Sequence, residues 1–424
     1  MRILACLLLI SCLFVSSINA QPAPTTNPLT LETIFRTAVT VQPSIRAARL
    51  KLVEAQARLA ETNAMRRPQL TFSGTVSGSH GNVADPFRIQ TYGTVEGIVS
   101  MAIPNRGRLS ALVLQAKGGN SAAEAGVQKA RLDLAFLVSE TFYTIHKARD
   151  ARNIAEETLK QAQRQMEDTQ KRVDAGDVPS ADVLKTQVPL SQARVALNRV
   201  ESGVRSAEQS LNILLNYPVD SAISLVPPTE MSPLSFTRDQ AVDRAIAQSP
   251  EIRAAMANLN STEAAIKLAR RASDPDWAIE AAHARTTDIT AYAGLTTIAI
   301  TVTAPISDGG VVKRQVQQSE AQRDQAKSAM ETVRQQVRRD ILQAWEDTSQ
   351  AEAALTGARE TTRITELSLE KAQQAYAAGL TTTRDVLDAL HEVAQARSDA
   401  NTALYDLAVS RAKLYQTMGE SPIK

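Results

Sequence analysis

Two carboxylates near the C-terminal end of the chain have a spacing that could bind cations. Asp385 and Asp388 are three residues apart, which places both on one face of a helix. The chain is internally repeated, and Asp182 in its first half occupies the position that corresponds to Asp385. Copies of the chain around a symmetry axis would crowd these charges into a narrow opening. Acids in the first turn of a helix also stabilise the helix end, by about 0.3–1 kcal/mol each, so both interpretations stay open.

The histidines offer no comparable arrangement. His80, His146, His283 and His391 are isolated and belong to no HExxH motif, and the chain has no GxSxG motif or phosphate-binding glycine loop. Scattered histidines on helices are usually surface residues. Histidine and methionine do not cluster as a metal-handling site would require. We therefore predict no enzyme, no catalytic residue, no metal site and no cofactor.

The composition excludes a further class of partner. Of 424 residues, 47 are Lys or Arg, 45 are Asp or Glu, and only 4% are aromatic. A nucleic-acid-binding protein usually has a strongly basic face interleaved with aromatic side chains, so we expect no nucleic acid as a partner. The low aromatic content instead indicates long helices that pack through small side chains.

Both cysteines lie at the N-terminal end of the chain, in a segment with the pattern of a secretory signal. Arg2 precedes an apolar run, and Ile18-Asn19-Ala20 is a small-residue exit before Gln21, which predicts a signal peptide over residues 1–20. The alternative is a lipoprotein signal acylated on Cys12, which would leave a shorter apolar segment. Beyond residue 20, no stretch approaches the ~20 apolar residues of a membrane-spanning helix. Any entry into a membrane would therefore use strands.

An internal repeat organises the rest of the chain. The sequence PSIRAA at residues 43–48 returns as PEIRAA at residues 250–255. The sequence AGDVPSADVL, which begins at Ala175, aligns with AGLTTTRDVL, which begins at Ala378. Loops between the matched blocks can absorb the small difference in offset. The chain therefore contains two copies of one unit.

Each unit is predicted to contain an opening helix, two strands, a very long helix and a return helix. The opening helices cover residues 31–67 and 238–273, with breaks at Pro43 and Pro250. Alternating apolar residues then predict strand pairs at about 69–103 and 276–304. No proline interrupts residues 108–174, which predicts a helix roughly 100 Å long. Heptad spacing pairs each long helix with its return helix as an antiparallel coil, as in Val183, Leu190 and Leu197.

Four strands cannot form a closed wall alone. Each predicted strand has about ten residues, which suffices for a tilted strand to cross a membrane. Open sheet edges are not tolerated in lipid, and small membrane barrels have at least eight strands. Several copies would have to share one barrel, continued by a helical tube. The alternative is a water-soluble strand pair packed on helices beside a structural coiled coil.

The turns between the long helices and the return helices resemble the TolC family of outer-membrane efflux proteins. The sequences AGDVPSADVL and AGLTTTRDVLDA carry the resemblance, together with the predicted signal peptide, the duplicated unit and the strand exit Pro104-Asn105-Arg106-Gly107. The resemblance covers essentially the mature chain. It implies a mainly α-helical fold with a membrane β element: a homotrimer with a 12-stranded barrel and a long periplasmic helical tunnel.

The resemblance also implies a function and partners. Channels of this family sit in the bacterial outer membrane, in contact with its lipid, and their tunnels project into the periplasm. They export drugs, metals or other toxic compounds as the exit duct of a tripartite efflux or type I secretion system, with a periplasmic adapter and an inner-membrane pump. A periplasmic adapter is the alternative, but adapters normally have one hairpin, whereas this chain has two complete units.

The resemblance assigns residues at the turns as well. Aspartates at the positions of Asp385 and Asp388 line the closed entrance of family channels, and a tyrosine at Tyr376 bonds toward an aspartate matching Asp182. An arginine completes this lock in some members; the aligned residue here is Thr381, and the neighbouring Arg384 is a candidate substitute. The expected adapter-docking residues are Ala175, Gly176, Asp177, Val178, Ala378, Gly379, Leu380 and Thr381. Glycines at the turns are also explained by helix reversal alone.

These expectations define a division of the chain. Residues 1–20 are the signal peptide, and residues 21–216 form the first repeat, with a helical hairpin at about 108–216. Residues 217–237 form a proline-rich linker in an equatorial belt. The second repeat covers residues 238–418, with a hairpin at about 311–418, and residues 419–424 form a tail.

Overall fold

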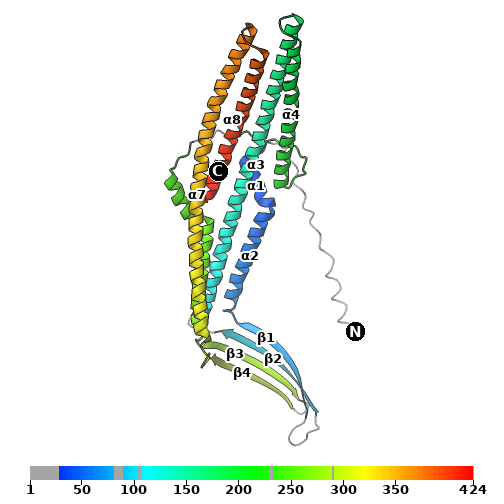
Figure 1. The fold of residues 1–424 in the computed structure, drawn as a ribbon. Coiled ribbons are helices and arrows are strands. Elements are labelled where there is room, and N and C mark those ends of the chain that lie inside the picture. The colour runs from blue at the N-terminus through cyan, green and yellow to red at the C-terminus, as the bar shows by residue number, and fades with distance from the viewer. Residues whose placement is uncertain (1–27, 81–88, 103–106, 229–232, 289–290, 424) are drawn as a thin grey trace, which may run out of the picture. The chain divides into compact units, whose positions relative to one another are not determined.

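A computed structural model describes residues 28–80, 89–102, 107–228, 233–288 and 291–423. The predicted signal peptide with Cys12, and residues 104–106 of the strand exit, lie outside the described residues. The elements follow the predicted order twice (Figure 1). They are α1 (Leu31–Val41), α2 (Pro43–Ala64), β1 (Gln69–His80), β2 (Ile89–Ala102), α3 (Arg108–Asp174), α4 (Ala181–Leu214), α5 (Arg238–Gln248), α6 (Pro250–Arg270), β3 (Asp276–Asp288), β4 (Ala291–Thr303), α7 (Val311–Ala377) and α8 (Thr383–Thr417).

The chain divides into two compact units that do not follow the two repeats. The first unit contains residues 1–42, 140–230 and 358–405, and the second contains residues 43–139, 231–357 and 406–424. Each unit draws segments from both repeats, and α3, α7 and α8 each contribute to both units. The predicted division of the chain at residues 217–237 is a division of sequence, and it stays a prediction.

The second unit contains one antiparallel sheet with the strand order β1-β2-β3-β4 (Figure 1). Its register aligns Phe72 with Gly97, Gly97 with His283, and His283 with Thr296. Because side chains alternate along a strand, this register determines which residues share a face. One face collects large apolar side chains from all four strands, each at least 37% exposed: Leu70, Phe72, Val76, Val95, Val99, Trp277, Ile279, Ile298, Ile300 and Val302.

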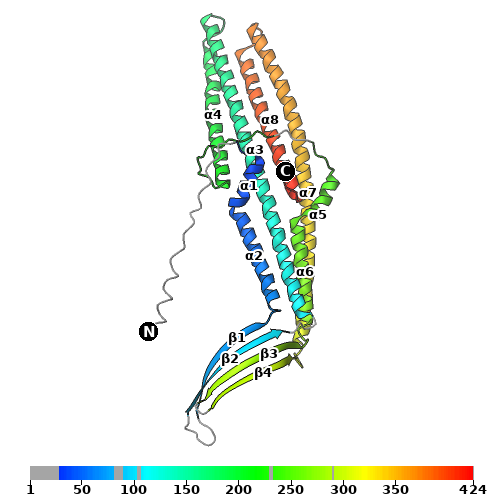
Figure 2. The same cartoon turned by 180° about the vertical axis from the view of Figure 1, so that it is seen from behind.

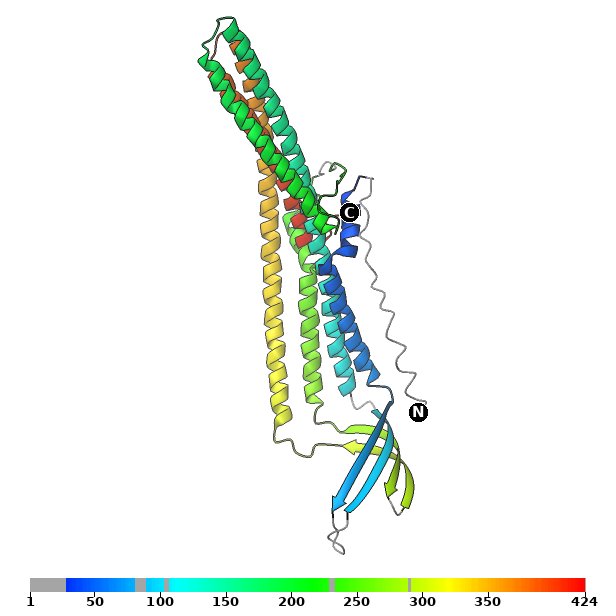
Figure 3. The same ribbon diagram turned by 90° about the vertical axis from the view of Figure 1, so that its right-hand side faces the viewer.

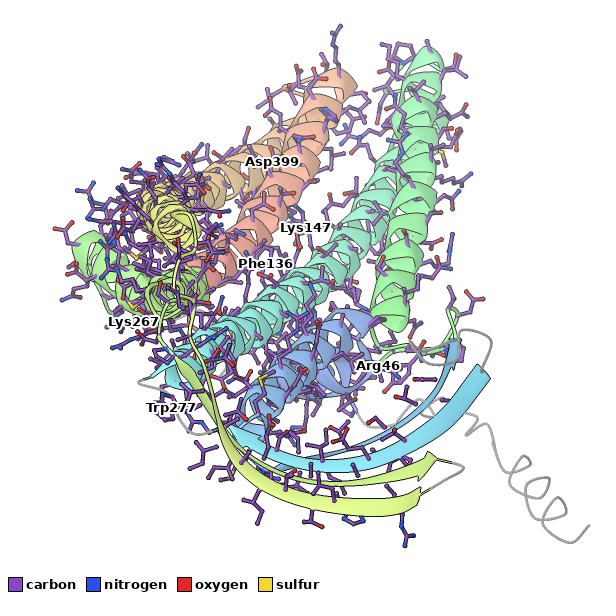
Figure 4. The ribbon with its side chains drawn as sticks, turned by 90° about the horizontal axis from the view of Figure 1, so that it is seen from below. Arg46, Phe136, Lys147, Lys267, Trp277 and Asp399 are labelled. Atoms are coloured by element: carbon purple, nitrogen blue, oxygen red, sulfur yellow. The ribbon has the colours of Figure 1, made fainter. Side chains whose placement is uncertain are left out.

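The opposite face of the sheet is largely polar. It carries Thr71, Ser73 and Thr75 of β1, and Glu96 of β2 is on the same side. Leu295 of β4 and Ile98 of β2 are apolar exceptions on this face. Trp277 marks the apolar face near the start of β3 (Figure 4). A strongly exposed apolar face opposite a polar one is the pattern of a sheet with lipid on one side and water on the other.

Helices of the second unit pack closely where side chains are small. A Cβ atom on Gly118 of α3 would lie 2.8 Å from the carbonyl oxygen of Ala257 and 2.8 Å from Ser261 Cβ on α6. The Ser261 hydroxyl donates to the Gln115 carbonyl at 3.2 Å. Arg270 of α6 pairs with Glu320 of α7 at 2.9 Å, so α6 lies between α3 and α7 (Figure 3).

The first unit contains two antiparallel helical hairpins (Figure 2). Ala162 of α3 packs with Leu190 and Ala193 of α4. Leu369 and Tyr376 of α7 pack with three residues of α8: Val386, Ala389 and Val393. The predicted heptad seams are therefore confirmed as the contact faces of the hairpins.

One expectation about the histidines is wrong. His146 of α3 is only 7% exposed, and its ring packs edge-on against Phe142 at 4.6 Å between centroids. Burial and the neighbouring Arg149 lower the pKa of His146. Its position follows from packing that a helical pattern alone does not reveal, because His146 directly follows Ile145, a fully buried residue of the α3 seam.

Candidate functional site

The two turns at one end of the first unit have the same backbone design. In the turn after α3, Gly176 has φ = 82°, and the amides of Gly176 and Asp177 donate to the carbonyls of Val173 and Arg172. In the turn after α7, Gly379 has φ = 74°, and the amides of Gly379 and Leu380 donate to the carbonyls of Tyr376 and Ala375. This pattern is a Schellman motif, in which a left-handed residue satisfies the last carbonyls of a helix. The prediction that these glycines reverse the helices is confirmed.

Most of the predicted docking residues are exposed in these turns. Leu380 is 81% exposed, a large fraction for an apolar side chain. Val178 and Thr381 are half-buried, and the other docking residues are exposed: Ala175, Gly176, Asp177, Ala378 and Gly379. Ser180, the residue before α4, makes no side-chain cap there. The turns therefore present a small, partly apolar surface.

A buried hydroxyl joins the two hairpins beside these turns. Thr383, at the start of α8, is 3% exposed and donates to Asp182 Oδ2 of α4 at 3.1 Å. Its Oγ1 lies 3.2 Å from the hydroxyl of Tyr376 on α7. The expected direct bond between Tyr376 and Asp182 is therefore replaced by a bridge through Thr383. A hydroxyl can make both contacts because it donates one hydrogen bond and accepts others.

An arginine completes this group of residues, although not the predicted one. The guanidinium of Arg172 lies 4.2 Å from the ring centroid of Tyr376, and its Nη1 donates to the Tyr376 carbonyl at 2.8 Å. A cation over an aromatic face contributes about 0.5–2 kcal/mol. Arg384 instead faces Asp388 at 3.7 Å with its side chain 83% exposed, so it does not take part. We name Arg172, Asp182, Tyr376 and Thr383 the entrance cluster.

Sequence reasoning missed both Arg172 and Thr383. Arg172 is 204 residues from Tyr376, and no local spacing connects the two. Thr383 was visible only as one of three threonines, Thr381 to Thr383, that precede the aspartates. Its burial depends on how α8 packs against α4 and α7.

Asp385 has an additional structural role. Its Oδ2 accepts from the hydroxyls of Thr381 and Thr382, both at 2.6 Å, and from the Thr382 amide at 2.9 Å. The Thr382 hydroxyl in turn accepts from the Asp385 amide at 3.4 Å, which forms a reciprocal cap at the start of α8. These bonds, chiefly that from the Thr381 hydroxyl, lower the pKa of Asp385 to about 2. Asp385 therefore caps the start of α8.

Asp182 is held as a carboxylate by its neighbours. Lys185 donates to Asp182 Oδ1 at 2.8 Å, and this bond, with a smaller contribution from Thr383, lowers the pKa of Asp182.

In the described part of the chain, no three His, Cys, Asp or Glu side chains are arranged to hold a metal ion. None of the helices described is both long enough and apolar enough to span a bilayer.

The family model "Outer membrane efflux protein" matches residues 36–217 and 241–420, most of the chain. The chain belongs to the outer membrane efflux protein family. This membership confirms the resemblance seen in the sequence, and the two matched segments correspond to the two repeats.

Individual relatives agree with this membership. This efflux protein is 25% identical over 364 residues to outer membrane efflux protein BepC of Brucella suis, covering 83% of this chain and 77% of the relative. It is 22% identical over 383 residues to the cobalt-zinc-cadmium resistance protein CzcC of Cupriavidus metallidurans, covering 90% and 88%. The fold matches that of the CmeC outer membrane channel of Campylobacter jejuni, with a TM-score of 0.79 at 16% identity over 92% and 85% of the chains.

The general function follows from these findings. This efflux protein is located in the outer membrane and serves as an exit duct for efflux systems. Its family and fold are those of transport channels rather than of enzymes. The alternative interpretations as an adapter or a structural coiled coil are thereby set aside. The predicted fold class, mainly helical with a small β element and a duplicated unit, is confirmed.

Proposed function

We propose that three copies of this chain share a 12-stranded barrel in the outer membrane, continued by a helical tunnel in the periplasm. The observation that carries the proposal is the sheet, which has one exposed apolar face and ends on β1 and β4. Within the described residues neither edge strand has a partner on its outer side, and unpaired strand edges are unstable in lipid. Pairing β1 of one copy with β4 of the next closes the wall. Three copies of four strands give an even-numbered barrel.

We further propose that the channel is the exit duct of a tripartite or type I system. An inner-membrane pump and a periplasmic adapter would deliver drugs, metals or other toxic compounds to it. The name of the relative CzcC associates that protein with cobalt, zinc and cadmium, so metal ions are one substrate class to test. The exposed tip residues, Leu380 above all, would dock the adapter.

Processing of the N-terminal segment and the repeat division belong to the same proposal. Cleavage after Ala20 would release a mature chain without cysteine, since Cys6 and Cys12 are the two cysteines of the sequence. Acylation at Cys12 is the competing route. The two family matches support a first repeat at 21–216 and a second at 238–418.

Membrane fractionation combined with unheated gel electrophoresis tests the proposed architecture. We expect the protein in the outer-membrane fraction, and we expect a band at three times the chain mass that resists SDS until it is heated. A folded monomer that remains soluble without detergent would contradict the proposal.

Deleting the gene should also sensitise cells to the exported compounds, and the unmodified gene should restore resistance.

We also propose that Asp385 and Asp388 form a cation-binding ring at the tunnel entrance. Since the pKa of Asp385 is lowered to about 2, its carboxylate and the cap that it forms are intact above about pH 4 and are lost as the pH falls through about 2. Block of the channel by divalent cations should therefore be present at neutral pH and weaken in planar bilayers as the pH falls toward the lowered pKa of Asp385. The variant Asp385→Ala with Asp388→Ala should lose the block at every pH.

A matched variant isolates the cause of the lowered pKa. Thr381→Val combined with Thr382→Val removes two of the donors to Asp385 and should move the loss of block up toward pH 4. Unchanged currents in the double alanine variant would contradict the cation ring. An unchanged pH profile in the double valine variant would contradict only the role of the threonine hydroxyls.

A further inference from the structure

An open cavity lies where the helices of the second unit meet the sheet. It has a volume of about 480 Å³ and is lined by residues at the start of α3 and at the end of α6. Arg108, the first residue of α3, pairs at 2.6 Å with Asp276, the first residue of β3. The cavity therefore lies at the level where the chain passes from helix to strand.

The cavity is basic. Its lining includes three cations, Lys267, Arg270 and Arg271, and one carboxylate, Asp274. The arginines follow Lys267 by three and four residues, so all three cations project from one face of α6. Lys267 is exposed and forms no ion pair with any described residue. The lining therefore has an excess of positive charge, and one of its cations has no counter-ion within the described chain.

The two arginines have counter-ions but keep donors free. Arg270 pairs with Glu320 at 2.9 Å, and Arg271 pairs with Asp274 at 3.0 Å. The arginine side chains are 62% and 45% exposed, and ion pairs this exposed contribute little to stability. A guanidinium has five N–H donors, so pairing with one carboxylate leaves donors for another acceptor. The cavity can therefore bind an anion without losing its internal pairs.

The neighbouring strand shows what lies beside the cavity. Trp277, the second residue of β3, is 45% exposed on the apolar face of the sheet. Three residues of chain span at most about 11 Å, so Trp277 lies within that distance of Asp274 in the cavity wall. Lys267 and Trp277 lie on the same side of the second unit (Figure 4). A tryptophan at the end of an apolar strand face is typical of the boundary between hydrocarbon and lipid headgroups.

We infer that this cavity binds the phosphate of a phospholipid headgroup, whose acyl chains lie on the apolar face of the sheet beside Trp277. The inference rests on the proposed membrane barrel, which places lipid against that face. Arginine binds phosphate oxygens through paired N–H donors, and lysine adds a compact charge. Basic pockets at the edge of a membrane bind anionic headgroups in this way. The cations and Trp277 therefore contact the two ends of one ligand.

The same cations also act on the helix itself. Lys267 and Arg270 lie in the last turn of α6, where positive charge stabilises the helix end. That effect needs no ligand and does not depend on the lipid present. A measurement that varies the lipid therefore separates the two roles.

Quenching of tryptophan fluorescence by brominated lipid tests the site. The purified full-length protein in detergent is titrated with phosphatidylglycerol that carries bromine on its acyl chains, and bromine quenches a tryptophan that it contacts. Trp277 and Trp345 are the two tryptophans of the chain. Trp345 lies 34 residues along α7 from Val311, or about 50 Å, so its emission stays constant. We expect the quenching of Trp277 to saturate.

Matched variants assign the binding to the cavity. Lys267→Gln should raise the lipid concentration for half-maximal quenching about fivefold, and Lys267→Gln with Arg271→Gln should raise it roughly twenty- to thirtyfold. The control Arg253→Gln removes one exposed cation from the same face of α6, 14 residues or about 21 Å further from the sheet. It should leave the half-maximal concentration unchanged. Lys267→Arg keeps the charge and should retain most of the affinity.

Two further ligands identify the source of the phosphate. Brominated diacylglycerol has no phosphate, so it should quench the unmodified protein and Lys267→Gln equally. Inorganic phosphate has no acyl chains, so an equal concentration should not displace brominated phosphatidylglycerol. Displacement at equal concentration would show that the cavity takes free phosphate, and it would overturn the assignment to a lipid.

The remaining outcomes also decide the inference. Equal half-maximal concentrations of phosphatidylglycerol for Lys267→Gln and Arg253→Gln would overturn it. Unheated gels of the same samples separate this failure from failure of the proposed function. An SDS-resistant trimer whose quenching does not depend on Lys267 overturns the lipid site alone, whereas absence of any outer-membrane trimer of the unmodified chain overturns the shared barrel.

Discussion

Gly118→Val will lower the thermal stability of the channel, whereas Gly119→Val will not. The Cβ of any residue at 118 would lie 2.8 Å from the Ala257 carbonyl oxygen, which is backbone and cannot move without displacing α6. Forcing extra atoms into such a contact costs roughly 1–3 kcal/mol. At Gly119, one residue along α3, an added Cβ meets nothing within 4 Å. Replacing glycine with another residue is mildly favourable in a helix interior, so this variant should be neutral or slightly stabilised.

Circular dichroism of the purified protein in detergent measures this contrast. We expect the midpoint of thermal unfolding to fall by roughly 1–3 °C for Gly118→Val and to be unchanged or slightly higher for Gly119→Val. The two substitutions are chemically identical and one residue apart in the same helix. Equal midpoints would show that α3 and α6 do not approach each other as described.

Thr383→Val will open the proposed entrance without unfolding the chain. Valine keeps the shape of threonine but removes the hydroxyl that links Asp182 of α4 to Tyr376 of α7. A hydrogen bond contributes about 0.5–1.5 kcal/mol, and one to a charged group up to about 3 kcal/mol. Losing both should shift the equilibrium between closed and open channels by roughly ten- to a hundredfold toward open.

Single-channel recording in planar bilayers measures the open probability directly. Thr356→Val is the control, because the Thr356 hydroxyl is exposed and bonds only the Glu352 carbonyl of its own helix. Wild type and Thr356→Val should have the same low open probability, and the open-to-closed ratio of Thr383→Val should be roughly ten- to a hundredfold higher. If all three proteins behave alike, the entrance cluster does not hold the channel closed.

The extended elements of this protein were predictable because their signals are local. Heptad spacing along α3 and α7, unbroken by proline, predicts their length, and alternation predicts the four strands. Pro43 and Pro250 mark the breaks between α1 and α2 and between α5 and α6, since proline suits the first turn of a helix. Capping also follows from short motifs, although the boxes at Thr30 and Thr237 were not predicted.

The residues proposed for the entrance could be predicted only in part. Repeat alignment and resemblance placed Asp182, Tyr376 and Asp385 at the turns, where the structure has them. The expected partner of Tyr376 was wrong. Its hydroxyl contacts the Thr383 hydroxyl, and it is Thr383 that donates to Asp182. The arginine was misassigned for a similar reason: Arg384 is adjacent in sequence, but Arg172 is adjacent in space.

The sequence by itself therefore determined the helices and strands, their order, their duplication, and the conclusion that four strands cannot close a barrel alone. Each of these depends on residues within one or two turns or strands. The tertiary structure decided which residues meet. Gly118 against α6, the Thr383 bridge and the single apolar face of the sheet all depend on register between segments far apart in the chain. A one-residue shift in register changes every such contact while leaving the local periodicity intact.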